Sequence, residues 1–177
     1  MADGYGRRSL RAVSPARRDE HSDPARVEPE LVSADATKIY FDQNAGQEET
    51  GDSLWSAPID GGAATLVRDQ TTVASVALVN DAPYWATGGH NTIEGPGAYS
   101  VSVPAPLDIV VEPSKKYFYV ISHSDSFDEI VRIDIASKTV VHCATAPALS
   151  AIAAVAGHVY FGAYAGKTWG IYDLTTP

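Results

Sequence analysis

The sequence has one cysteine, one methionine and no long apolar run, and each scarcity excludes a class of protein or site. The lone Cys143 cannot form an internal disulfide, and the sequence has neither a CxxC pair nor a Cys/His cluster with zinc spacing. The longest apolar run, residues 151–156, is mostly alanine and far shorter than the roughly 20 residues that a membrane-spanning helix needs. We therefore expect no membrane span and no site built from cysteines.

Positive charge is also scarce, because 13 Lys+Arg stand against 22 Asp+Glu and give a net charge of −9. A protein that binds the phosphate backbone needs a basic surface, so this balance argues against nucleic acid as a partner. Residues 1–30 hold six arginines and six acidic residues and are neutral overall. The whole negative charge therefore belongs to residues 31–177.

Residues 1–30 contain few large apolar side chains, and Pro15, Pro24 and Pro29 interrupt any helix. Such a segment buries too little surface to offset the entropy of ordering it, which predicts a disordered leader. It is not a secretory signal peptide, because no apolar stretch follows the arginines. An organelle transit peptide and a wrongly placed start site remain as alternatives, so the localisation stays unknown.

A repeat runs through residues 31–177. Four similar segments are centred on Tyr40, Tyr84, Tyr119 and Tyr160, with spacings of 44, 35 and 41 residues. Each segment follows a short apolar run and a tight turn, a pattern that predicts an antiparallel hairpin. A third strand is expected after each hairpin, at residues 53–59, 98–103, 129–135 and 169–174, and a fourth only at residues 65–67 and 139–141.

A period near 40 residues with up to four strands per unit is typical of a β-propeller blade. The sequence thus predicts an all-β protein of about four blades, at residues 31–72, 73–106, 107–147 and 148–177, with the second and fourth blades incomplete. The alanine-rich residues 144–156 would score as a helix by propensity. Pro147 and the similarity of residues 150–155 to residues 74–79 favour a strand instead.

Residues 112–120, residues 130–141 and the stretch Leu54-Trp55-Ser56-Ala57-Pro58-Ile59-Asp60-Gly61-Gly62 resemble blades of the bacterial YVTN, NHL and TolB-like propeller superfamily. The resemblance implies a propeller fold but transfers no catalytic residue. Its members usually have six or seven blades and are often periplasmic or secreted. This chain is then either a small closed ring or a partial propeller, and the open blade edges of a partial propeller would favour strand addition or self-association.

The loops that join second to third strands should emerge on one face, where binding residues of such scaffolds usually lie. The first loop carries alternating oxygen donors that would suit calcium, but it lacks the EF-hand pattern because Gln47 and Ser53 stand where Gly and Glu are required. A solvated acidic loop is the alternative. The histidines of the second and third loops would meet across the central channel or remain ordinary surface residues. The candidate metal ligands are Asp42, Asn44, Glu48, Glu49, Asp52, His90, His123, Asp125 and Asp128.

The remaining sequence features give only weak evidence for a functional site. His142 and Cys143 are adjacent in a strand and point to opposite faces, so Cys143 is expected to be a small buried apolar residue. The three tryptophans are expected to pack between blades rather than to form a sugar platform. Residues 166–168 imitate a phosphate-binding loop only by chance, and GxSxG, GxGxxG and HExxH do not occur.

These observations favour a non-enzymatic binding or scaffolding module whose target is a protein or peptide at the loop face or an open edge. No cofactor is indicated other than calcium at the acidic loops. A metal-dependent hydrolase or lactonase that uses the carboxylates and histidines of one face is the competing hypothesis. A truncated propeller without independent function is the third.

Overall fold

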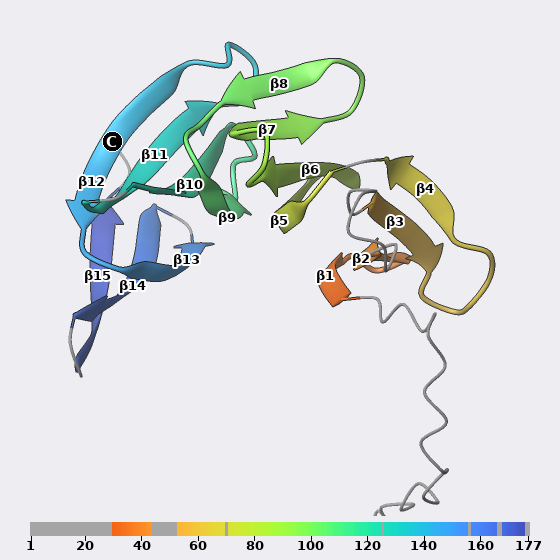
Figure 1. The fold of residues 1–177 in the computed structure, drawn as a ribbon, viewed down its shortest axis with the longest axis horizontal. Helices are drawn as coiled ribbons and strands as arrows, with labels where there is room; N and C mark the ends of the chain where they lie inside the picture. The colour runs from red at the N-terminus through yellow and green to blue at the C-terminus, as the bar shows by residue number, and fades with distance from the viewer. Residues whose placement is uncertain are drawn as a thin grey trace, which may run out of the picture.

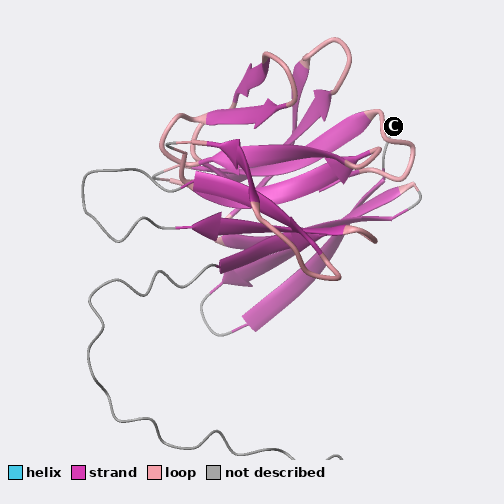
Figure 2. Cartoon of the chain, turned by 90° about the vertical axis from the view of Figure 1, so that its right-hand side faces the viewer, coloured by secondary structure: helices cyan, strands magenta, loops and turns pink. Residues whose placement is uncertain are grey.

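The structure, a computed structural model, describes residues 30–43, 53–69, 71–124, 126–155, 157–165 and 168–175. Residues 1–29, which hold nearly all of the predicted leader, lie outside this range. All regular structure in the described residues is β-strand, as Figure 2 shows. No helix in this part of the chain is long and apolar enough to cross a membrane.

The strands form four antiparallel sheets in which consecutive strands are neighbours, and the sheets follow one another around an arc (Figure 1). This is the arrangement of a partial β-propeller, and the predicted all-β blade architecture is confirmed. The first blade contains β1 (Glu30–Ala34), β2 (Lys38–Gln43), β3 (Ser53–Pro58) and β4 (Thr65–Arg68); the second contains β5 (Val73–Val79), β6 (Ala82–Thr87), β7 (Thr92–Gly95) and β8 (Tyr99–Ser102); the third contains β9 (Pro106–Val111), β10 (Tyr117–His123), β11 (Asp128–Asp134) and β12 (Val140–Ala146); the fourth contains β13 (Leu149–Val155), β14 (His158–Ala165) and β15 (Thr168–Thr175).

Local sequence explains the hairpins. Asn80 and Asp81 join β5 to β6 with φ angles of 51° and 64°, a conformation that Asn and Asp tolerate better than other residues with a Cβ. Between β1 and β2, one Asp35 oxygen accepts hydrogen bonds from the backbone N–H groups of Thr37 and Lys38, at 2.6 and 2.7 Å. These bonds hold the pKa of the Asp35 carboxyl below its usual range. Turn residues therefore fix the register in which each apolar run pairs.

The expectation that the second blade lacks its outer strand is wrong. Residues 88–97 are rich in glycine and were expected to be one loop, but Thr92–Gly95 forms β7. Ile93 is fully buried and pairs in register with Ala86 on one side and Val101 on the other. The segment expected as the third strand is therefore the fourth strand of this blade, β8.

The spacing of 35 residues between Tyr84 and Tyr119 reflects short strands in the second blade, not a missing strand. The fourth blade has three strands in the part of the chain that the structure describes, as expected.

Adjacent blades pack through three apolar clusters. Tyr40 and Trp85 lie in the cluster between the first and second blades, and Tyr119 and Phe161 in that between the third and fourth. The predicted interblade role of Trp85 is confirmed, because this residue is only 4% exposed. Trp55 is half-buried, and the side chain of Trp169 lies outside the description.

The alanine-rich residues 144–156 contain the end of β12 and all of β13, so the strand prediction is confirmed. Leu149 and Ile152 of β13 are buried against the third blade, and Cys143 of β12 is partly buried in the same cluster. Burial raises the pKa of the Cys143 thiol, and the nearby Arg132 only partly opposes this effect. Cys143 is therefore a packing residue, as expected.

Candidate functional site

The turns that join second to third strands emerge at the same end of the blades as the connections from one blade to the next. This follows from antiparallel order, because each second strand ends where the next blade begins. We call this end the loop face; its described turns and connections are residues 69, 71–72, 88–91, 103–105, 124, 126–127 and 147–148. The predicted loops at residues 44–52 and 166–167 lie outside the described residues.

Buried polar side chains gather directly beneath the loop face. Thr71, Thr87, Ser122 and Asp128 lie at strand ends there and are at most 4% exposed. The Thr87 and Thr92 hydroxyls lie 2.8 Å apart across the β6–β7 turn, and the Ser122 hydroxyl donates to the Pro104 carbonyl at 2.6 Å. These bonds hold the strand ends in place, so the loop face is a fixed platform.

One histidine–acid pair on this face is His123 with Asp128. The two residues stand at the end of β10 and the start of β11, opposite each other in register. His123 Nδ1 lies 2.5 Å from Asp128 Oδ1, and Asp128 Oδ2 accepts the Leu149 backbone N–H at 2.6 Å. The histidine side chain is 55% exposed and the aspartate only 5%. The carboxylate therefore orients a surface imidazole whose second nitrogen remains for a partner.

Two further histidines face carboxylates. His90 Nδ1 lies 3.7 Å from Glu94 Oε1 in the second blade, and His142 Nδ1 lies 2.8 Å from Glu129 Oε2 on the outer strands of the third. The two loop-face pairs differ in geometry, because His123 and Asp128 are opposite each other in register, whereas His90 lies in the turn before β7 and Glu94 pairs with Trp85. In both blades an exposed imidazole nevertheless lies near an acid of the third strand.

The predicted metal ligands that the structure describes are not gathered into one cluster. Asp42 is half-buried in β2, and His90 and His123 each face an acid of their own blade. The described residues contain no group of three or more His, Cys, Asp or Glu side chains that could hold a metal ion. The remaining candidates, Asn44, Glu48, Glu49, Asp52 and Asp125, lie outside the description.

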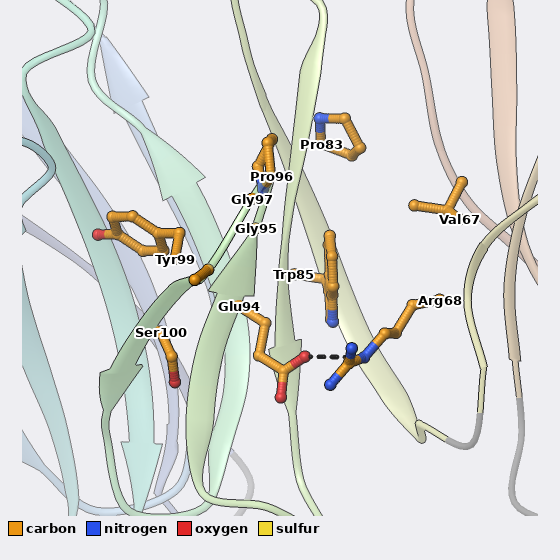
Figure 3. A pocket seen from close by; sticks show the side chains of 11 residues that line it. Val67, Arg68, Pro83, Trp85, Glu94, Gly95, Pro96, Gly97, Tyr99 and Ser100 are labelled. Carbon is orange, nitrogen blue, oxygen red and sulfur yellow. Dashed lines mark ion pairs between the residues drawn. The ribbon is translucent and has the colours of Figure 1, made fainter.

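A groove of about 680 Å³ separates the outer strand of the first blade from the second blade (Figure 3). Its volume falls within the range of small-ligand sites. Apolar side chains line it together with one ion pair, in which Arg68 Nε lies 3.3 Å from Glu94 Oε2. The lining residues are Val67, Arg68, Pro83, Trp85, Glu94, Gly95, Pro96, Gly97, Ala98, Tyr99 and Ser100.

Trp85 gives the groove an unused hydrogen-bond donor. The indole Nε1 is buried and has no hydrogen-bond partner, which is uncommon for a buried N–H. Figure 3 shows this nitrogen on the side of the ring nearest to Arg68 and Glu94. Sequence reasoning missed the groove because it placed Glu94 in a loop. The available signal was the alternation Thr92-Ile93-Glu94, which puts Glu94 on the face opposite to Ile93.

No protein-family model matches the chain, and no curated protein sequence matches it. Its backbone is similar to a chain from the crystal structure of a nidogen/laminin complex, with a TM-score of 0.54 and 12% identity over 84% of this chain and 75% of that one. It is also similar to TolB from Acinetobacter baumannii (TM-score 0.55, 14% identity, 82% of this chain and 40% of that one). A third similar structure is the tricorn protease (TM-score 0.56, 13% identity, 80% and 16%).

These similarities support the β-propeller fold and nothing finer, because identities this low carry no information about sites. The chain spans less than half of the TolB chain and a sixth of the tricorn chain. It therefore corresponds to a part of those proteins.

Proposed function

We propose that this chain is a non-enzymatic binding module that holds a segment of another protein in the groove between its first two blades. The observation that carries the proposal is the buried Trp85 N–H in the wall of that groove, which makes no hydrogen bond with any described residue. A backbone carbonyl of a bound peptide is a suitable acceptor, because an unpaired buried donor costs about 1–3 kcal/mol and pairing recovers it.

The groove offers the other features that a peptide requires. Val67, Pro83 and Pro96 provide apolar walls, and Glu94, only 13% exposed, places an acid beside them. The flexible Arg68 side chain is half-exposed and can move aside as the peptide enters. The His90 imidazole, in the loop-face turn before β7, lies 3.7 Å from Glu94 Oε1. One of the similar chains comes from a complex of two proteins, nidogen and laminin, which supports protein binding as a use of this fold.

A display library of random peptides, selected on the full chain, tests the proposal. Selected peptides should bind Trp85→Phe up to about tenfold more weakly, because this change removes one hydrogen bond and keeps an aromatic ring. Trp55→Phe makes the same change outside the groove and should leave the affinity unchanged. If no peptide is selected, or if selected peptides bind both variants equally well, the groove is not the binding site.

The competing function, a metal-dependent hydrolase that uses calcium or another cation at the loop face, is favoured by the histidine–acid pairs of the second and third blades. Calorimetric titration of the full chain with calcium and with zinc tests it. Micromolar binding that is lost in His123→Ala supports a metal site, whereas the absence of binding heat removes this hypothesis. Cooperative thermal unfolding of the chain would separately exclude a truncated product without independent function.

A further inference from the structure

The three blade junctions share one packing rule. In each, a tyrosine from the second strand of one blade meets an aromatic residue of the following blade. Tyr40 shares a cluster with Trp85, and the Tyr84 ring lies 5.0 Å from the ring of Phe118. Tyr119 and Phe161 share the third cluster. The repeated tyrosine therefore always points toward the next blade.

The fourth tyrosine follows the same rule but meets no further blade among the described residues. Tyr160 lies opposite Ala153 in register, on the side of the fourth blade away from the buried Phe161. It is 36% exposed, whereas Tyr40 and Tyr119 are 2% and 1% exposed. Ala151, Ala153, Val155 and Tyr160 are all exposed and form a surface that we call the blade-4 face. His158 stacks on Tyr160, and Asp173 lies opposite Tyr160 in register.

The first blade carries the matching surface. The residue after each repeated tyrosine packs against the preceding blade, and Trp85, Val120 and Phe161 are buried at this position. Phe41 occupies it in the first blade and is only half-buried. Phe41, Trp55 and Leu66 lie opposite one another across β2, β3 and β4, and Ile39 pairs with Ala57 beside them. We call these five residues the blade-1 face.

We propose that the blade-4 face of one chain packs on the blade-1 face of a second copy, with Tyr160 of each copy against Phe41 of the other. The contact would continue the three junctions within the chain, since both faces present the residue types that those junctions bury. The residues that define the two faces are uncharged, and Asp173, opposite Tyr160 in β15, is the charged residue whose desolvation the contact must accommodate. Two copies related by a two-fold axis would satisfy all four end faces and form a ring of eight blades, within the usual range for propellers.

This assembly differs from the strand addition expected at open blade edges. Every blade of the chain has an inner and an outer edge strand, whereas only the two end blades have a sheet face with no neighbouring blade among the described residues. A head-to-tail contact of faces also differs from a contact between two identical faces. In the head-to-tail case, each interface needs one intact blade-4 face and one intact blade-1 face, from different copies.

Sedimentation velocity of the full chain tests the proposal at about 100 µM, where an association with a Kd of about 1 µM is nearly complete. The wild-type chain should sediment as a dimer, and Tyr160→Glu and Phe41→Glu should each sediment as monomers. Phe127→Glu, which changes an exposed aromatic residue on the loop face, should remain a dimer. If Phe41→Glu does not fold by circular dichroism, Leu66→Glu, at a residue that is 44% exposed, replaces it.

Mixing the two monomeric variants gives the decisive measurement. Tyr160→Glu retains an intact blade-1 face and the Phe41→Glu variant retains an intact blade-4 face, so the mixture should form a dimer through one interface. A mixture that stays monomeric overturns the head-to-tail arrangement. A monomeric wild-type chain, or dimers that survive both substitutions, also overturns the proposal and assigns these faces to another segment or partner.

Discussion

The carboxylate of Asp128 accepts the backbone N–H of Leu149 at 2.6 Å and thereby joins the third blade to the fourth by a buried polar bond. Its other oxygen lies 2.5 Å from Nδ1 of His123. The second and third blades have a comparable link, in which the Ser75 hydroxyl donates to Asp108 at 2.7 Å. Each of these two junctions therefore combines an apolar cluster with a directional bond that fixes how the blades meet.

Replacing Asp128 with alanine should destabilise the chain by about 1–3 kcal/mol, because the Leu149 N–H loses its acceptor in a buried place. Asp128→Asn should cost less, since its amide can still accept from Leu149 while the neutral imidazole of His123 accepts from the amide nitrogen. Urea unfolding followed by circular dichroism measures both changes.

Glu129→Ala is the matched control. Glu129 is the next residue in β11 and bonds only to the exposed His142 among the described contacts, so its loss should cost about 0–1 kcal/mol. Equal losses for Asp128→Ala and Glu129→Ala would mean that the bond to Leu149 does not hold the junction.

The blade repeat could be predicted from the sequence because its signals are local. A tyrosine, an apolar run and a turn recur within a few residues of one another. The β5–β6 turn also has residues suited to its backbone angles, Asn80 and Asp81. The second blade was misjudged because β7 has only four residues between two turns and ends in Gly95. There the burial of Ile93 between two strands outweighs the preference of glycine for loops.

The site was less predictable, because its contacts join residues that are distant in sequence. His123 and Asp128 were both identified as candidates, but their pairing depends on the register of β10 and β11. The bond from Asp128 to Leu149 and the ion pair from Arg68 to Glu94 cross between blades. Such contacts depend on how the blades pack against one another, and the repeat pattern does not encode that geometry.

Gly95→Ala should destabilise the chain by about 1–3 kcal/mol, because a methyl group there would overlap the ring of Tyr84, with only 2.7 Å to Cε1. The ring has little freedom to move, since Tyr99 and Phe118 each lie 5.0 Å from it. Thermal and urea unfolding measure the effect. Gly88→Ala adds the same methyl group where no atom lies within 4 Å, and its effect should stay within about 0.5 kcal/mol. If Gly95→Ala unfolds like Gly88→Ala, Tyr84 is not confined between the blades.

Cys143 should react slowly with iodoacetamide in the folded chain, because burial raises the pKa of its thiol and leaves less thiolate at about pH 8. Unfolding in urea should speed the reaction to the rate of free glutathione, and the single cysteine lets mass spectrometry follow one site. Equal rates in the folded and unfolded chain would contradict the packing of Cys143 against the fourth blade.

Tyr99 should make the chain less stable in alkaline solution. Burial, with smaller contributions from Tyr84 and Asp134, raises the pKa of Tyr99 to about 12, whereas an unfolded chain releases this proton near pH ~10. The stability that depends on the protonated hydroxyl is thus complete below about pH 10 and is lost as the pH rises toward 12.

Tyr99→Phe should lose less stability between about pH 8 and pH 11 than the wild-type chain, as measured by urea midpoints. At neutral pH the variant should be at least as stable as the wild type, because the buried hydroxyl has no hydrogen-bond partner. Parallel loss of stability in both chains with rising pH would show that Tyr99 ionises as readily in the folded chain as in the unfolded one.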